Sequence, residues 1–127
     1  MRVREGGSHL TNLQEMVHAL KEVAGAEAVA VINRDGGIVA AELPSNVSQE
    51  TFSIMCAAIL GAGMTAAMEL KHASPRRVLL ESEDSTVVIR EVGRRAMLVL
   101  VLPPERRLSE LETALSRFIQ AAVADLG

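Results

Sequence analysis

The sequence predicts an α/β fold: a three-layer α/β/α sandwich around a five-stranded, mostly antiparallel sheet. Two unbroken apolar runs, residues 28–32 and 96–102, are typical of strands buried on both faces. Residues 8–25 and 105–125 each place apolar side chains at helical spacing on one side. Between them lies a long helical segment, residues 48–72, which has no charged side. These helices would cover both faces of the sheet.

The composition indicates one folded domain. The chain has 127 residues, of which 49% are hydrophobic and 23% charged, enough to form a core. Its net charge is −3, and Phe52 and Phe118 are its only aromatic residues. We therefore expect no nucleic-acid partner, because there is neither a basic excess nor a set of stacking platforms. The first residues lack the apolar stretch of a signal peptide, so we expect a cytoplasmic protein.

A tail and an amphipathic helix are expected at the N-terminus. Residues 1–7 contain charges and two glycines without periodicity, which predicts a flexible tail before a single domain over residues 8–127. Ser8 is a plausible N-cap, and Gly25 suits a left-handed helix end. The apolar stripe of this helix consists of Leu10, Leu13, Met16, Val17, Leu20 and Val23.

Two groups of strands follow the first helix. Residues 28–32 and 38–41 flank Asp35-Gly36, whose glycine can supply the positive φ of a tight hairpin turn. Later in the chain, residues 76–82 have charges at both ends, as an edge strand does, and lead into strands at 86–92 and 96–102. Residues 82–85 between them form a turn, in which the two serines and two acidic side chains are expected to make local hydrogen bonds.

The last helix is expected at about residues 105–125, after Pro103-Pro104. Its apolar face consists of Leu108, Leu111, Leu115, Phe118, Ile119, Ala122 and Leu126. The two hairpin-linked groups must share one sheet, and its two apolar strands belong in the middle. This predicts the strand order 2-1-5-4-3, with the first and last helices on one face and the middle helix on the other.

The middle helix is the most informative segment. Ser48 should cap it and Pro75 should prevent its continuation. One face is expected to meet the sheet: Phe52, Met55, Cys56, Ile59, Gly63, Ala66, Ala67 and Leu70. The opposite face is uncharged as well: Ile54, Ala57, Ala58, Gly61, Met64, Thr65 and Met68. At roughly 35 Å the helix would also be longer than a five-stranded sheet is wide, about 24 Å.

A second copy of the chain is the simplest cover for this outer face, because symmetric pairing makes one patch self-complementary. A membrane span is the alternative, but the uncharged run is near the lower length limit and rich in small residues. We therefore expect no membrane insertion. Cys56 is best explained as a small buried hydrophobic residue.

The sequence shows few features of a catalytic or cofactor-binding site. Gly36-Gly37 leads into a strand and not into a helix, so no phosphate-binding loop is expected. His9, His18, His72 and Cys56 share no metal-ligand spacing, so we expect no metal site. The paired arginines, such as Arg94-Arg95, are either a solvated rim or contacts to an acidic partner surface. We expect neither cofactor nor enzymatic activity.

In the order and spacing of these elements, the chain resembles the roadblock family of dynein light chains and their bacterial and archaeal relatives. The resemblance covers about residues 10–122. It rests on Gly25-Ala26, residues 28–32, Asp35-Gly36, Ile38-Val39-Ala40, residues 51–70, Val87-Val88-Ile89, Gly93 and residues 97–102.

The resemblance implies a dimer that serves as a non-enzymatic regulator or scaffold of Ras-like small GTPases, or as an adaptor on motor complexes. Family dimers pair their middle helices, and their edge strands can join the two sheets. By this resemblance, the expected dimer contacts of this chain are Ile54, Ala57, Ala58, Gly61, Thr65 and Met68 on the middle helix and Val78, Leu79 and Leu80 on the third strand. A small-molecule-sensing module is the alternative, although few polar residues stand at predicted core positions.

Overall fold

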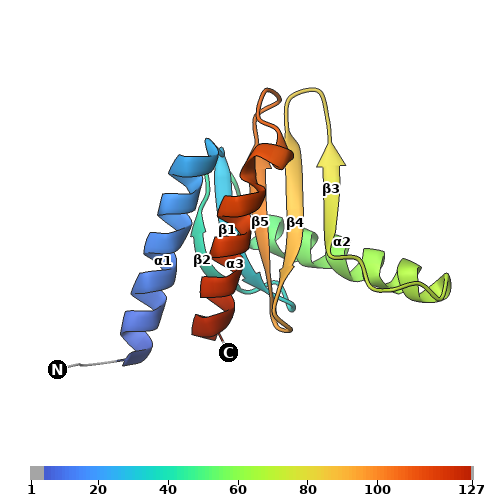
Figure 1. Ribbon diagram of the computed structural model, residues 1–127, viewed down its shortest axis with the longest axis horizontal. Coiled ribbons are helices and arrows are strands. Elements are labelled where there is room, and N and C mark those ends of the chain that lie inside the picture. The colour runs from blue at the N-terminus through green and yellow to red at the C-terminus, as the bar shows by residue number, and fades with distance from the viewer. Residues whose placement is uncertain (1–4, 127) are drawn as a thin grey trace.

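The computed structural model describes residues 5–126 and shows the three predicted layers around one sheet (Figure 1). The strands follow the predicted order β2-β1-β5-β4-β3, and all four pairings are antiparallel. Their bounds are Ala28–Asn33 for β1, Ile38–Glu42 for β2, Arg77–Glu81 for β3, Thr86–Val92 for β4 and Ala96–Leu102 for β5. The two apolar strands, β1 and β5, lie in the interior of the sheet, as their composition requires.

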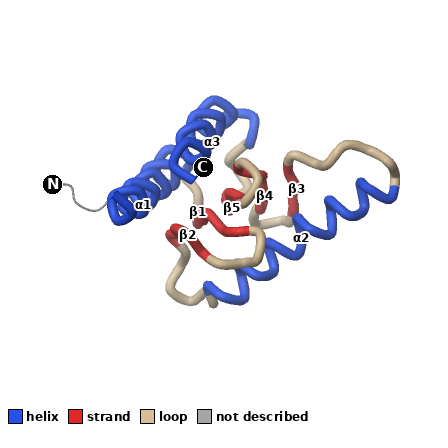
Figure 2. Tube along the Cα trace, turned by 90° about the horizontal axis from the view of Figure 1, so that it is seen from below, coloured by secondary structure: helices blue, strands red, loops and turns tan. Residues whose placement is uncertain are grey.

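The three helices are distributed over the two faces as expected (Figure 2). The first and last, α1 (Glu5–Ala24) and α3 (Glu112–Leu126), lie side by side on one face. The middle helix α2 (Gln49–Glu69) crosses the other face. Ser48 caps α2 as predicted, and its hydroxyl oxygen accepts a hydrogen bond from the Thr51 amide at 3.3 Å.

The expected start of α1 was wrong. The helix begins at Glu5, so Ser8 lies inside it and is not its N-cap. A serine is favourable at a helix start but is also tolerated in the first turns, which is why this signal did not locate the boundary. Residues 5–7 of the predicted tail are therefore helical, and residues 1–4 lie outside the described residues.

The last helix begins later than the expected residue 105. A short 3-10 turn, η1 (Leu108–Leu111), precedes α3. Arg107 still has an extended backbone, with φ −96° and ψ 134°. The Arg106 side chain is bound elsewhere: its guanidinium donates to the Ala24 and Val23 carbonyls at 2.9 and 3.1 Å and so satisfies the C-terminus of α1. This tertiary contact could not be predicted from local sequence.

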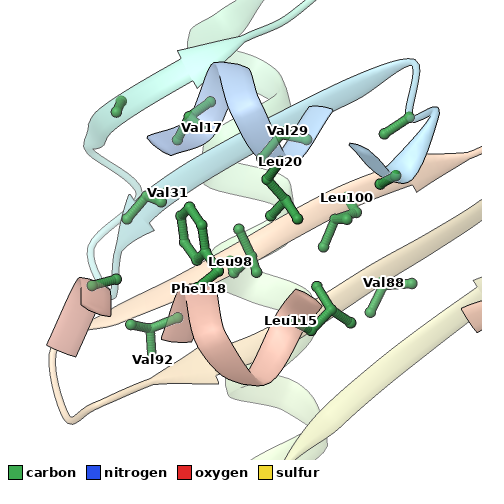
Figure 3. Packing of buried hydrophobic residues seen from close by; sticks show 14 of the residues in the cluster. Val17, Leu20, Val29, Val31, Val88, Val92, Leu98, Leu100, Leu115 and Phe118 are labelled. Carbon is green, nitrogen blue, oxygen red and sulfur yellow. The ribbon is translucent and has the colours of Figure 1, made fainter. Parts of the chain in front are cut away.

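The larger core lies between the sheet and the pair α1 and α3 (Figure 3). Val17 and Leu20 from α1 meet Leu115 and Phe118 from α3 above the β1 and β5 side chains. The predicted apolar face of α3 is buried or partly buried here over its whole length. On α1, the predicted stripe holds from Leu13 to Leu20, whereas Val23 is exposed and the side chain of Leu10 lies outside the described residues.

A smaller core lies on the α2 side. Its buried members are Ala30, Ile32, Cys56, Leu60, Ile89, Met97 and Val99. The β1–β2 hairpin passes close beneath α2: a Cβ added to Gly36, which has φ +96°, would come within 3.0 Å of Ile54. Glycine is thus required at position 36 for two reasons: the positive φ of the turn and the close approach of α2. Gly25, with φ +64°, ends α1 in the left-handed conformation, as predicted.

Candidate interaction surface

The middle helix is only partly covered by its own sheet. In both views α2 runs across the sheet and continues past β3, the last strand (Figures 1 and 2). Of its 21 residues, only Ser53, Cys56 and Leu60 are buried. These three are spaced so that they form one narrow stripe along a helix. The rest of this apolar helix is half-buried or exposed.

The expected orientation of α2 was partly wrong. Met55 and Leu70, assigned to the sheet face, are 52% and 65% exposed, and Ala66 is also exposed. Ala57, assigned to the outer face, packs with Met64 against the smaller core, while the fully buried Leu60 was in neither set. The physical reason is that a helix which is apolar all round has no amphipathic signal to fix its rotation.

Most of the predicted dimer residues of α2 nevertheless lie on its open side. Ile54 and Met68 are 43% and 70% exposed, and Ala58, Gly61 and Thr65 are exposed too. A Cβ at Gly61 would meet no described atom within 4 Å. Met55 and Leu70 add large apolar side chains to this surface. We refer to Ile54, Met55, Ala58, Gly61, Thr65, Met68 and Leu70 as the outer α2 surface.

The third strand lies at the sheet edge next to α2. β3 pairs with β4 alone among the described strands, so its other edge carries backbone groups open to a partner. Leu79 and Leu80 are exposed, as an interface would require. Val78 differs, because it packs under α2, where it lies 3.5 Å from the position of a Cβ on Gly63. Two of the three predicted strand residues are therefore available for contact.

Several arginines are used within the fold and are not free for a partner. Arg34 follows β1 and binds Glu91 of β4 at 2.6 Å, while its guanidinium also reaches the Met64 sulfur at 3.5 Å. Arg77 of β3 binds Glu112 of α3 at 2.9 Å. Arg94 and Arg95 remain exposed at the β4–β5 turn. Because some of these arginines are paired with glutamates in the fold and the others are exposed to solvent, they agree better with a solvated rim than with a strongly basic docking site.

The described residues contain no cluster of three or more His, Cys, Asp or Glu side chains that could hold a metal ion. Burial raises the pKa of the Cys56 thiol to about 11, so the thiol is protonated at neutral pH and is a poor nucleophile. Ser82 donates to Asp84 at 2.9 Å within its own turn, as predicted for a local contact.

A hollow of about 510 Å³ lies where the β1–β2 turn meets the start of α2. It is wide open, and the acidic side chains of Asp35 and Glu50 are part of its lining. A specific small-molecule site usually encloses its ligand and places a few buried polar groups around it. This hollow does not enclose a ligand, and the one buried polar side chain among its described lining residues, Ser53, already donates to the Glu50 carbonyl at 3.2 Å, so the hollow gives no support to ligand sensing.

Comparison with known proteins agrees with this architecture. A model of the Roadblock/LC7 domain matches residues 12–102, which include every strand and α2. The chain belongs to the Roadblock/LC7 family. Among relatives, uncharacterized protein MJ0310 of Methanocaldococcus jannaschii is 26% identical over 81 residues, which are 64% of this chain and 71% of that protein.

Solved structures of this family have the same fold at low sequence identity. MglB of Myxococcus xanthus is 15% identical and superposes with a TM-score of 0.86 over 98% of this chain and 91% of its own. A Roadblock/LC7 domain from Streptomyces avermitilis is 12% identical, with a TM-score of 0.82 over 89% of this chain and 96% of its own. At such identities the comparison establishes the fold and leaves the partner open.

Proposed function

We propose that this Roadblock/LC7 protein is a homodimeric, non-catalytic regulator or scaffold of a Ras-like small GTPase in the cytoplasm. The observation that carries the proposal is the outer α2 surface, an apolar face on a helix that overhangs its own sheet and ends beside the open β3 edge. A contiguous apolar surface of this kind marks a protein or membrane contact.

A second copy fits this surface better than lipid does. α2 is long and apolar enough to cross a membrane, and among the described helices it alone meets that description. However, its buried stripe of Cys56 and Leu60 packs against sheet residues such as Ile89, so inserting the helix would expose the smaller core. In a dimer, Gly61 and Ala58 would let two α2 backbones approach closely while Met68 and Leu70 enlarge the contact.

Self-association also has support among the relatives. MglB has been described in a tetrameric arrangement, and that protein superposes on this chain with a TM-score of 0.83. The role with a GTPase is supported by family membership, since the family resemblance implies platforms for Ras-like GTPases.

A nucleotide-dependent binding assay tests the proposed function. Purified protein would be immobilised and incubated with Ras-like GTPases from the same genome, each loaded either with GDP or with a non-hydrolysable GTP analogue. We expect one GTPase to bind at micromolar concentration and to prefer one nucleotide state, because its switch segments differ between the two states.

A matched control is the same assay with a GTPase of another family. Failure of every Ras-like GTPase to bind in either state would contradict the proposal. If a GTPase binds equally in both states, the protein is a scaffold and not a regulator that reads the nucleotide.

A further inference from the structure

The two outer edges of the sheet differ in whether another element of the chain covers them. β3 leaves its outer edge open, whereas α1 runs along β2, the strand at the other end (Figure 1). An uncovered edge strand is a template for pairing with another chain, and proteins commonly cover or block such edges. The way in which α1 blocks β2 depends on one side chain, Gln14.

Gln14 makes the two hydrogen bonds that a neighbouring strand would make. Its Nε2 donates to the Ala41 carbonyl oxygen at 2.9 Å, and its Oε1 accepts from the Ala41 amide at 3.3 Å. Residues of an antiparallel edge strand point their backbone groups alternately toward the partner strand and away from it. Ala41 is one of the residues whose backbone groups point away, and the glutamine amide has the same donor and acceptor as a peptide group.

A second contact from the same helix lies one turn later. His18 Nδ1 is 2.6 Å from Glu42 Oε2, so residues 14 and 18 of α1 engage two successive residues of β2. The side chains of Gln14 and His18 are exposed at this edge and are not part of the core. Their positions are therefore better explained by the closure of an edge than by packing.

We propose that Gln14 closes the β2 edge against strand addition, and that the strand it excludes is β3 of a second copy of this chain. Both strands have five residues, and β3 is the edge that each copy leaves open. On β3 the Arg76 carbonyl accepts from the Glu91 amide of β4 at 3.1 Å, so the backbone groups of Arg77 and Leu79 point to the open edge, as those of Ala41 do on β2. An antiparallel pairing of these two edges would therefore set Ala41 opposite Arg77 or Leu79, with backbone hydrogen bonds in place of those made by Gln14.

The excluded contact would not close on itself. Because β2 and β3 are different surfaces, their pairing is head-to-tail, and such contacts build open chains of molecules unless a rotation closes a ring. The same contact would compete with any symmetric dimer that uses β3. Closure of β2 by Gln14 thus directs self-association toward a closed assembly, and this inference does not depend on a GTPase partner.

The test is the assembly state of Gln14 variants, measured by sedimentation velocity over a range of protein concentrations. Gln14→Ala and Gln14→Met both remove the amide, and methionine keeps the length and the high helix propensity of the side chain. We expect both variants to form species larger than wild type, in proportions that grow with concentration. Glu15→Ala, an exposed change on the same helix, is the matched control and should sediment as wild type does.

Hydrogen exchange gives a second readout at the edge itself. In the wild type the Ala41 amide should exchange slowly for an edge residue, and in monomeric fractions of both variants it should exchange severalfold faster while the Leu20 amide is unchanged. Faster exchange at both sites would mean that α1 has simply loosened, which would overturn the proposal. If the alanine variant fails to fold, the methionine variant carries the test.

A further substitution tests which strand is excluded. Leu79→Pro, combined with Gln14→Ala, would remove a backbone donor that β3 turns toward its open edge and should return the protein to the wild-type size distribution. Growth that persists in the double variant would overturn β3 as the excluded strand. A wild-type distribution for both single Gln14 variants would overturn the closure itself.

Discussion

At the residue scale, the end of α2 contains a strained position. Lys71 has φ +62° and is the one non-glycine residue with positive φ in the described part of the chain. The turn is held by the His72 amide, which donates to the Ala67 carbonyl at 2.9 Å, and by the Lys71 amide, which donates to Met68 at 2.9 Å. These bonds satisfy helix-end carbonyls, but a left-handed lysine costs about 1–2 kcal/mol.

Replacing this lysine should therefore stabilise the protein. For Lys71→Gly we expect the free energy of unfolding to rise by about 0.5–1 kcal/mol, because glycine adopts positive φ without a Cβ clash but loses more entropy on folding. Urea denaturation followed by circular dichroism measures the change. His72→Gly is the control: it is next in sequence, its φ is not positive, and it should not stabilise. An unchanged or lower midpoint for Lys71→Gly would show that the turn is not strained.

Lys71 also illustrates what a local pattern can miss. The predicted helical segment, residues 48–72, ends with Lys71 and His72, whose positive charges suit the C-terminal end of a helix dipole. In the structure the helix ends at Glu69, and Lys71 forms the turn that leads away from it. A lysine has no intrinsic preference for this conformation, so the chain adopts it because the fold requires the turn there.

At the scale of elements, α2 shows the limit of hydrophobic patterning. The pattern predicted the helix, its cap at Ser48 and an uncovered apolar face, and these are observed. It did not predict the rotation of the helix, since Leu60 and Met55 are equally apolar candidates for the sheet side. Contact with the β1, β4 and β5 side chains decides that rotation.

The proposed dimer seam can be tested at Gly61. A Cβ there meets no described atom within 4 Å, so Gly61→Glu should leave the single chain folded and even favour the helix. At a close α2–α2 contact the same change would bury two carboxylates, and we expect the dimer to dissociate to monomer. Light scattering coupled to size-exclusion chromatography measures the mass.

The matched control is Ser116→Glu, an exposed change on α3 at the opposite face of the molecule. It adds the same charge and should leave the mass unaltered. A Gly61→Glu protein that remains dimeric would place the seam away from the outer α2 surface.

At the scale of the whole molecule, the two sides of the sheet differ in how well they are covered. α1 and α3 bury the larger core, whereas α2 contributes only Ser53, Cys56 and Leu60 as buried residues. A single chain thus leaves much apolar surface in water on its α2 side, and covering it by association stabilises the folded state.

Stability should for this reason depend on protein concentration. If the folded state is a dimer and the unfolded state is not, the free energy of unfolding rises by about 1.4 kcal/mol of dimer for each tenfold increase in concentration. Urea midpoints measured over a hundredfold range should therefore increase steadily. Gly61→Glu should show no such dependence. Identical midpoints for the wild type at all concentrations would contradict a dimeric folded state.

The sequence was sufficient to predict the sheet order, the distribution of helices over its faces and the hairpin turn at Gly36. These features follow from hydrophobic periodicity and turn chemistry, which act between residues close in sequence. Segments that are apolar on all sides also indicated that β1 and β5 are central and that α2 needs an external cover.

Tertiary structure alone decided the features that join distant parts of the chain. The rotation of α2, the capping of α1 by Arg106 and the contact between Gln14 and Ala41 each depend on residues that local patterns do not connect. Gln14 and Ala41 are 27 positions apart, and Arg106 and Ala24 are 82 apart. Such contacts form because the packed sheet brings these groups within hydrogen-bonding distance, and a polar side chain on an exposed helix face does not by itself specify which distant backbone group it will meet.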